Sequence, residues 1–180
     1  MDKKDIALTL LKEKITPGKL CELKIASHWS MYPLFKKQSA VKIRSVFIKD
    51  LRLGDIVVYR KDRDLIAHRY IRMAKHSSGQ AIITKGDNAV SSDHYVVLNE
   101  ELLGKVVAFQ IANKMINCEN VFWRLINALL ARVSLLETNC FQAVEKIDSR
   151  NLMPAGLRKI LIFFKKAEGG IRIILIKLLV

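Results

Sequence analysis

Cysteine is scarce in this chain of 180 residues, which contains three: Cys21, Cys118 and Cys140. They are odd in number and far apart, and no CxxC or CxxH pair is present. A disulfide framework needs paired cysteines and a zinc knuckle needs closely spaced ligands, so both are disfavoured. We expect the three to be small apolar side chains, buried or half-buried. The sequence implies no metal ion and no cofactor.

Long apolar runs are also missing. The longest stretch without a charged residue is 25–35, whereas a membrane-spanning helix needs about 20 predominantly apolar residues. The segment MDKKDIALTLLKEK has charges at both ends and no small-residue cleavage site, so it is not expected to be a signal peptide. A cytoplasmic location is therefore expected, with or without peripheral contact to the inner face of a membrane.

Basic residues, in contrast, are abundant: 31 Lys and Arg against 17 Asp and Glu give a net charge of +14. Such a surplus indicates an acidic partner, which could be a nucleic acid, an anionic membrane surface or an acidic substrate. The hydrophobic fraction of 51% is ample for a core.

Three parts of the chain differ in their residue pattern. Residues 1–19 are expected to form a short helix that ends at a Thr-Pro-Gly turn. Residues 20–113 contain short β-rich runs separated by polar turns, among them VKIRSVFI, GDIVVYR, DLIAHRYIRM and LLGKVVAFQIA. These runs predict a mainly β domain built from a coiled antiparallel sheet.

The third part, residues 114–180, is predicted to be a basic amphipathic helical extension. VFWRLINALLARVSLL places six apolar residues at helical spacing: Phe122, Leu125, Ile126, Leu129, Leu130 and Val133. A second candidate helix, AGLRKILIFFKKAE, follows Pro154. Two interpretations stay open: residues 121–180 rest on an anionic membrane surface, or the helices pack on the β domain and on each other.

Ser30 is the first residue with a chemical interpretation. It lies in SHWSMYP, after a predicted strand. A Ser hydroxyl is a poor nucleophile unless a base takes its proton. Of the four histidines, His68 lies in the middle of a strand-like run, and Asp87 and Asp93 in the polar loop KGDNAVSSD could orient its imidazole. A turn serine and a structural histidine are the ordinary alternative.

Five segments in order, SMYP, LRLGDIVVY, AHRYI, TKGDNAVSSD and LLGKVV, resemble the successive boxes of type I signal peptidases. The resemblance covers about residues 25–108. It is to the endoplasmic-reticulum and archaeal branch, which uses His where the bacterial branch uses Lys. The clan also contains the LexA-type self-cleaving repressors, and its fold is a coiled, mainly antiparallel β domain.

The resemblance implies a serine endopeptidase that cleaves a peptide or protein leader held as an extended segment against a strand edge. It assigns Ser30 as nucleophile, His68 as general base and Asp93 as the group that orients His68. Asp87 would be a supporting carboxylate. Three further residues, His28, Trp29 and Met31, would belong to the substrate groove, with Met31 packed beneath the nucleophile.

Two other functions are weighed against this one. Trp29 stands where signal peptidases usually have Gly, and His28 where they often have Ser or Gly, which together suggest a catalytically silent peptide-binding module on the same fold. The high positive charge suggests a LexA-like regulator, but the residues before the first strand are too few for a helix-turn-helix. Nucleic acid is therefore the least expected partner.

Overall fold

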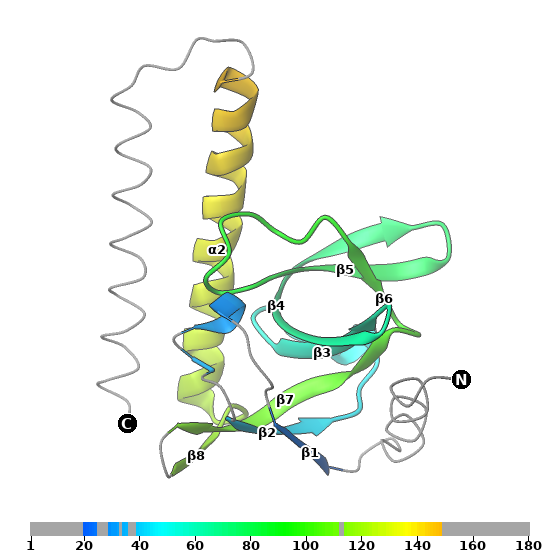
Figure 1. Ribbon diagram of the computed structural model, residues 1–180, viewed down its shortest axis with the longest axis vertical. Helices are drawn as coiled ribbons and strands as arrows, with labels where there is room; N and C mark the ends of the chain where they lie inside the picture. Colours follow the sequence, from blue (N-terminus) through cyan, green and yellow to red (C-terminus); the bar gives the residue numbers. More distant parts are fainter. Residues whose placement is uncertain (1–19, 25–28, 33, 36–38, 112–113, 149–180) are drawn as a thin grey trace.

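The computed structural model describes residues 20–24, 29–32, 34–35, 39–111 and 114–148 (Figure 1). At residue 29 and at residues 144–148 only the backbone is described. The predicted helices at 1–19 and after Pro154 lie outside these ranges. The strands are β1 (Leu20–Lys24), β2 (Ala40–Arg44), β3 (Ile56–Lys61), β4 (Asp64–His76), β5 (Gly79–Lys85), β6 (Val96–Leu98), β7 (Leu102–Ile111) and β8 (Lys114–Asn117). The helices are two short 3-10 turns, η1 (Trp29–Met31) and η2 (Ile48–Asp50), and α2 (Val121–Asp148).

All eight strands belong to one antiparallel sheet in the order β1-β2-β7-β3-β4-β5-β6, and β8 pairs with the β7 strand as well. The prediction of a mainly β fold followed by a helix is confirmed. The predicted boundary at residue 113 is wrong, because β8 extends the sheet to Asn117. The sequence KMIN is too short to stand out as a strand, and its pairing with β7 stabilises it.

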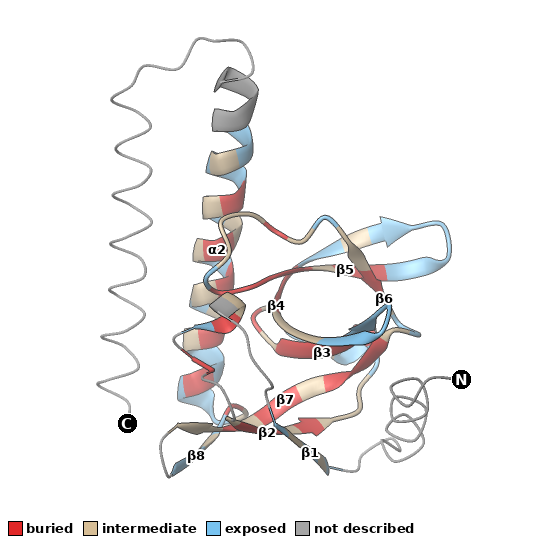
Figure 2. Cartoon of the chain, in the orientation of Figure 1, coloured by how far each residue is buried: buried red, intermediate tan, exposed pale blue. Residues whose placement is uncertain are grey.

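The central strands consist largely of buried residues, as the red segments of β3 and β7 show (Figure 2). In β3, Ile56 and Val58 join one buried cluster while Val57 and Tyr59 join another. Because successive side chains of a strand point to opposite faces, both faces of β3 are buried. The continuous apolar run IVVY is the sequence signature of such a strand.

Helix α2 stands upright against one side of the sheet (Figure 1). Its β-facing side is not the apolar stripe that the sequence displays. The buried residues of α2 are instead Trp123, Asn127, Ala131, Ser134 and Thr138. The other side of the helix leaves large apolar residues exposed, so a sequence pattern that predicts the helix correctly does not predict which side packs.

Gly54 explains why small and polar residues face the sheet. It has a φ of +92°, and a Cβ atom built there would lie 2.2 Å from the backbone oxygen of Asn127. The helix backbone therefore approaches the turn before β3 more closely than any other residue type at position 54 would allow.

Within the described ranges, no helix is both long enough and apolar enough to cross a membrane.

Candidate active site

Ser30 lies in the 3-10 turn η1, and not at the end of a strand as expected. Its half-buried position is held from two directions. The backbone N–H of Asn88 donates to the Ser30 carbonyl at 2.7 Å, and the next residue, Met31, is 2% exposed within the core. Phe35 also donates its N–H to the Met31 carbonyl at 3.0 Å. The turn thus holds the serine against the loop that follows β5.

His68 and Asp93 form a close pair. His68 belongs to β4, opposite Val57 of β3, and its Nδ1 lies 2.6 Å from Oδ2 of Asp93. The two side chains are 13% and 20% exposed, so the pair is largely shielded from water. A carboxylate on Nδ1 leaves Nε2 as the nitrogen that can accept a proton.

Two further groups hold the Asp93 carboxylate. Thr84 donates its hydroxyl to Oδ2 at 2.5 Å, and Tyr59 donates its own at 3.3 Å. Burial acts to raise the pKa of Asp93, but the hydrogen bond and charge of His68, with the bonds from Thr84 and Tyr59, outweigh it and lower that pKa. Burial also raises the pKa of Tyr59, so its phenol stays protonated and donates.

Gly86 locates Ser30 relative to His68. A Cβ atom built on this glycine would lie 2.9 Å from Cβ of Ser30 and 3.2 Å from Nε2 of His68. The serine side chain and the free imidazole nitrogen therefore border the same small space, and only a residue without a side chain fits between them. The loop after β5 brings the two together from elements far apart in the sequence.

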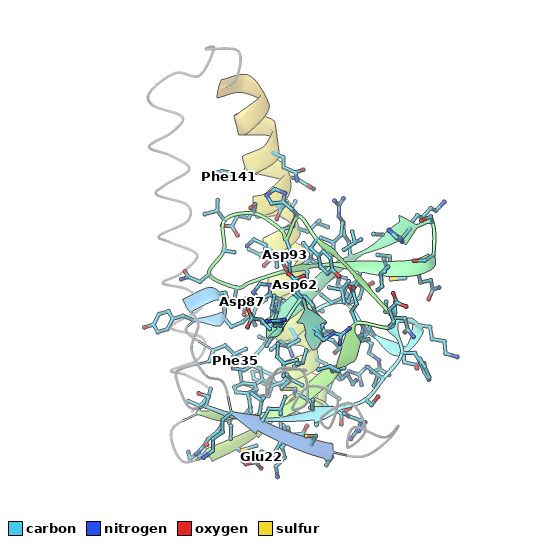
Figure 3. All side chains as sticks on the ribbon, turned by 45° about the vertical axis from the view of Figure 1, so that its right-hand side comes forward. Glu22, Phe35, Asp62, Asp87, Asp93 and Phe141 are labelled. Atoms are coloured by element: carbon cyan, nitrogen blue, oxygen red, sulfur yellow. The ribbon has the colours of Figure 1, made fainter. Side chains whose placement is uncertain are left out.

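Asp87 pairs with an arginine. It accepts a bidentate pair of hydrogen bonds from Arg69, each 2.7 Å long, and the two side chains are 0% and 3% exposed. Arg69 also donates to the Gly54 carbonyl at 2.9 Å and to Oδ1 of Asn127 at 2.8 Å. Asp87 thus anchors the loop to the sheet and to α2, as a supporting carboxylate would. In Figure 3, Asp87 and Asp93 lie near each other beside the helix.

The predicted groove residues have different outcomes. Met31 is 2% exposed and its sulfur accepts the Asp87 N–H at 3.5 Å, in agreement with its predicted packing beneath the nucleophile, and this burial leaves it little surface to offer a substrate groove. Its long apolar side chain fills the core instead. His28 and the side chain of Trp29 lie outside the described residues.

Two other candidate groups are less suited to such chemistry. His76 bonds the Ser78 hydroxyl at 2.8 Å in the exposed hairpin between β4 and β5, and no described carboxylate bonds this pair. Burial raises the pKa of Cys118 to about 12, so its thiol is a poor source of thiolate.

Sequence reasoning missed Tyr59, Thr84, Arg69 and Gly86. Thr84 and Gly86 lie inside the segment TKGDN, so their position beside the predicted acid was available as a signal. Tyr59 and Arg69 also lie inside quoted segments, LRLGDIVVY and AHRYI, but their contacts join separate strands and a loop, so their roles could not be predicted locally.

The lowered pKa of Asp93 predicts a loss of stability in acid. Its folded pKa is below the unfolded value of about 3.9. The ionised Asp93 therefore contributes fully to the free energy of unfolding above that value, and this contribution disappears as the pH falls through the folded pKa. Asp93→Asn should thus cost most stability near neutral pH and progressively less below about pH 4.

Urea unfolding at a series of pH values measures this, with the exposed Asp64→Asn as the control for loss of one carboxylate. The wild type and Asp93→Asn should not differ by a constant amount. A stability difference that stays the same from pH 3 to pH 7, roughly the range of carboxylate titration, would contradict this prediction.

No family model matches this chain, and the comparison with curated proteins finds no match either. The interpretation of the site therefore depends on the geometry above and on the order of the five sequence segments.

Proposed function

We propose that this protein is a serine endopeptidase of the signal-peptidase-like kind, which cleaves an extended segment of a peptide or protein. One observation carries the proposal. His68 is bonded through Nδ1 to a buried carboxylate, while its Nε2 borders the space next to the Ser30 side chain. A serine needs such a base beside it to become a nucleophile, and this placement supports that role for His68.

The steps follow from the positions of the groups. Oγ of Ser30 attacks the scissile carbonyl while Nε2 of His68 takes the hydroxyl proton, giving a tetrahedral intermediate. The imidazolium then gives that proton to the leaving amine as the C–N bond breaks, and an acyl-enzyme remains on Ser30. Water, deprotonated by His68, attacks the ester and releases the second product. Asp93 holds the Nδ1–H throughout and stabilises the positive ring.

The negatively charged oxygen of the tetrahedral intermediate needs hydrogen-bond donors to stabilise it. The backbone N–H of Ser30 is proposed as one of them, because the amide of an acylated residue lies close to the carbonyl that it binds. The resemblance to signal peptidases supports an extended substrate paired with a strand edge, of which a leader segment of a precursor is an example.

A silent peptide-binding module is the second candidate. Trp29, next to the proposed nucleophile where the family usually has Gly, is the observation that favours it. Such a module would keep the geometry of Ser30, His68 and Asp93 but would not turn over a substrate.

A serine-directed acylating probe followed by mass spectrometry distinguishes the two. In the wild type we expect the label on Ser30, and in His68→Ala we expect it to form at least about 100-fold more slowly, because a general base contributes 10²–10⁴-fold. Ser78→Ala is a matched control, since Ser78 also contacts a histidine but in the exposed hairpin.

Labelling at Ser78 in place of Ser30 would contradict the proposal. Absence of any label on Ser30, in a wild-type protein whose fold is intact, would favour the silent module.

A further inference from the structure

The end of β5 carries a second buried ion pair. Lys85, the last residue of this strand, donates from Nζ to Oε2 of Glu137 in α2 at 2.5 Å. The two side chains are 0% and 16% exposed, so the ammonium group has almost no contact with water. A charge removed from water is costly unless a partner compensates it. Lys85 therefore depends on Glu137 for its place in the interior.

A second buried cation increases this dependence. Lys85 lies directly opposite Arg69 in the pairing of β4 with β5, so their side chains share one face of the sheet, with Cβ atoms about 5 Å apart. Neither side chain is exposed. Arg69 has Asp87 as its carboxylate, and Lys85 has Glu137. Like charges at this spacing repel each other, so the loss of either carboxylate leaves a cation unbalanced.

Two successive side chains hold the end of β5 from both faces of the sheet. Thr84 donates its hydroxyl to Asp93 beside the imidazole, whereas Lys85 points to the opposite face and bonds α2. The next residue is Gly86, which has no side chain to fix its own position. The bonds of Thr84 and Lys85 therefore determine where Gly86 begins the loop.

The position of Gly86 matters because the space between Ser30 and His68 lies against it. A Cβ atom built there would lie within 3.2 Å of both side chains. The same loop donates the Asn88 N–H to the Ser30 carbonyl at 2.7 Å. A misplacement of about 1 Å at such a site is enough to slow a reaction about 100-fold.

We propose that Glu137 of α2 is a positioning residue for the candidate site: through Lys85 it fixes the place of Gly86. The resemblance to signal peptidases covers about residues 25–108 and so assigns no role to α2. The helix is thus an additional part of the site in this chain. The inference rests on the proposed function only where a reaction at Ser30 is measured, because the position of the loop is measurable without a substrate.

Glu137→Gln in the full chain tests the position of the loop. This substitution keeps the shape of the side chain and removes its charge, so the buried Lys85 loses its anion. The end of β5 should then open toward water. The Asn88 amide, whose acceptor is the Ser30 carbonyl, should exchange its hydrogen at least about 10-fold faster than in the wild type. Hydrogen exchange followed by NMR measures this for single amides under native conditions.

Thr138→Ala is the matched control on the same helix. Thr138 is 2% exposed, and its hydroxyl donates to the Ser134 carbonyl within α2, so its loss weakens the helix and leaves the Lys85 pair in place. Exchange at Asn88 should be unchanged in this variant. Lys85→Met/Glu137→Gln should restore slow exchange, because the cation that lacked a partner is gone. Such a rescue separates the loss of the ion pair from a general loss of helix packing.

The serine-directed acylating probe connects the position of the loop to the reaction. Glu137→Gln should be labelled at Ser30 at least about 10-fold more slowly than the wild type, because the space between the nucleophile and His68 is altered. Thr138→Ala should be labelled at the wild-type rate. A wild type that is not labelled at all would contradict the proposed peptidase, and the exchange of Asn88 would still decide whether Glu137 positions the loop.

Two results would overturn the inference. One is exchange of Asn88 in Glu137→Gln at the wild-type rate. The other is equal acceleration in Glu137→Gln and Thr138→Ala, which would assign the effect to helix packing. Glu137→Asp replaces Glu137→Gln if the latter does not fold, because it keeps the charge on a shorter side chain. Its Asn88 amide should exchange at an intermediate rate, and the wild-type rate there would overturn the inference as well.

Discussion

Ser30→Ala and His68→Ala are each expected to reduce kcat/KM for a cleaved peptide by at least about 10⁴-fold, and the double variant should lose little more. The reason is that the two groups act in one proton transfer, so removing either removes the same route through the transition state. Both side chains border one small space beside Gly86, which supports such coupling. Steady-state kinetics of the wild type, the two single variants and the double variant measure the effect.

Asp93→Asn should cost less than either, because it leaves the nucleophile and the base in place and changes only the orientation and charge at Nδ1. All variants should keep the far-UV circular dichroism of the wild type. Additive losses in the double variant would show that Ser30 and His68 do not act together. A Ser30→Ala variant with unchanged activity would remove the serine from the mechanism.

Arg69→Met is expected to lower the free energy of unfolding by about 3–5 kcal/mol, because it leaves a buried carboxylate without its cation. Asp87 is 3% exposed and accepts two bonds from this one side chain. The Gly54 carbonyl and the Asn127 amide oxygen would lose a donor as well. Urea unfolding of the variant and the wild type at neutral pH measures the difference.

Arg44→Met is the matched control. Arg44 also pairs with a carboxylate, Glu119, at 2.8 Å, but the two side chains are 38% and 34% exposed, so water replaces the lost partner. We expect a change of about 0–1 kcal/mol there. Arg69→Met/Asp87→Leu should be more stable than Arg69→Met alone, because neither of these two positions then carries a buried charge. If Arg69→Met and Arg44→Met lowered the free energy of unfolding by similar amounts, the buried pair of Arg69 and Asp87 would not be the stabilising contact that we infer.

Much of the fold was accessible from residue patterns. The β-branched runs and the polar turns between them predicted most strands, because a strand's preference for such residues is local and its turns need particular backbone conformations. The change to helical spacing near residue 119 predicted α2. The order of five short segments was enough to single out Ser30, His68, Asp87 and Asp93, since each lies at a position that its segment marks.

Three-dimensional packing decided the rest. Asp87 and Asp93 lie in one polar loop, and nothing local distinguishes their roles. Arg69 draws Asp87 into the interior, whereas Thr84 and Tyr59 hold Asp93 at the imidazole. These contacts join residues from three strands and a loop, so they exist only once the sheet has formed.

Helix α2 also separates what the sequence predicts from what the packing decides. Apolar spacing determined that a helix forms, because it depends only on which residues recur every three or four positions. Which side of that helix meets the sheet was decided by the close approach at Gly54 and by the polar contact of Asn127 with Arg69. A buried Arg that needs acceptors imposes a specific rotation, while apolar contact alone is non-directional. The sequence by itself therefore determined the elements and the candidate chemical groups, and the tertiary structure decided which groups face each other.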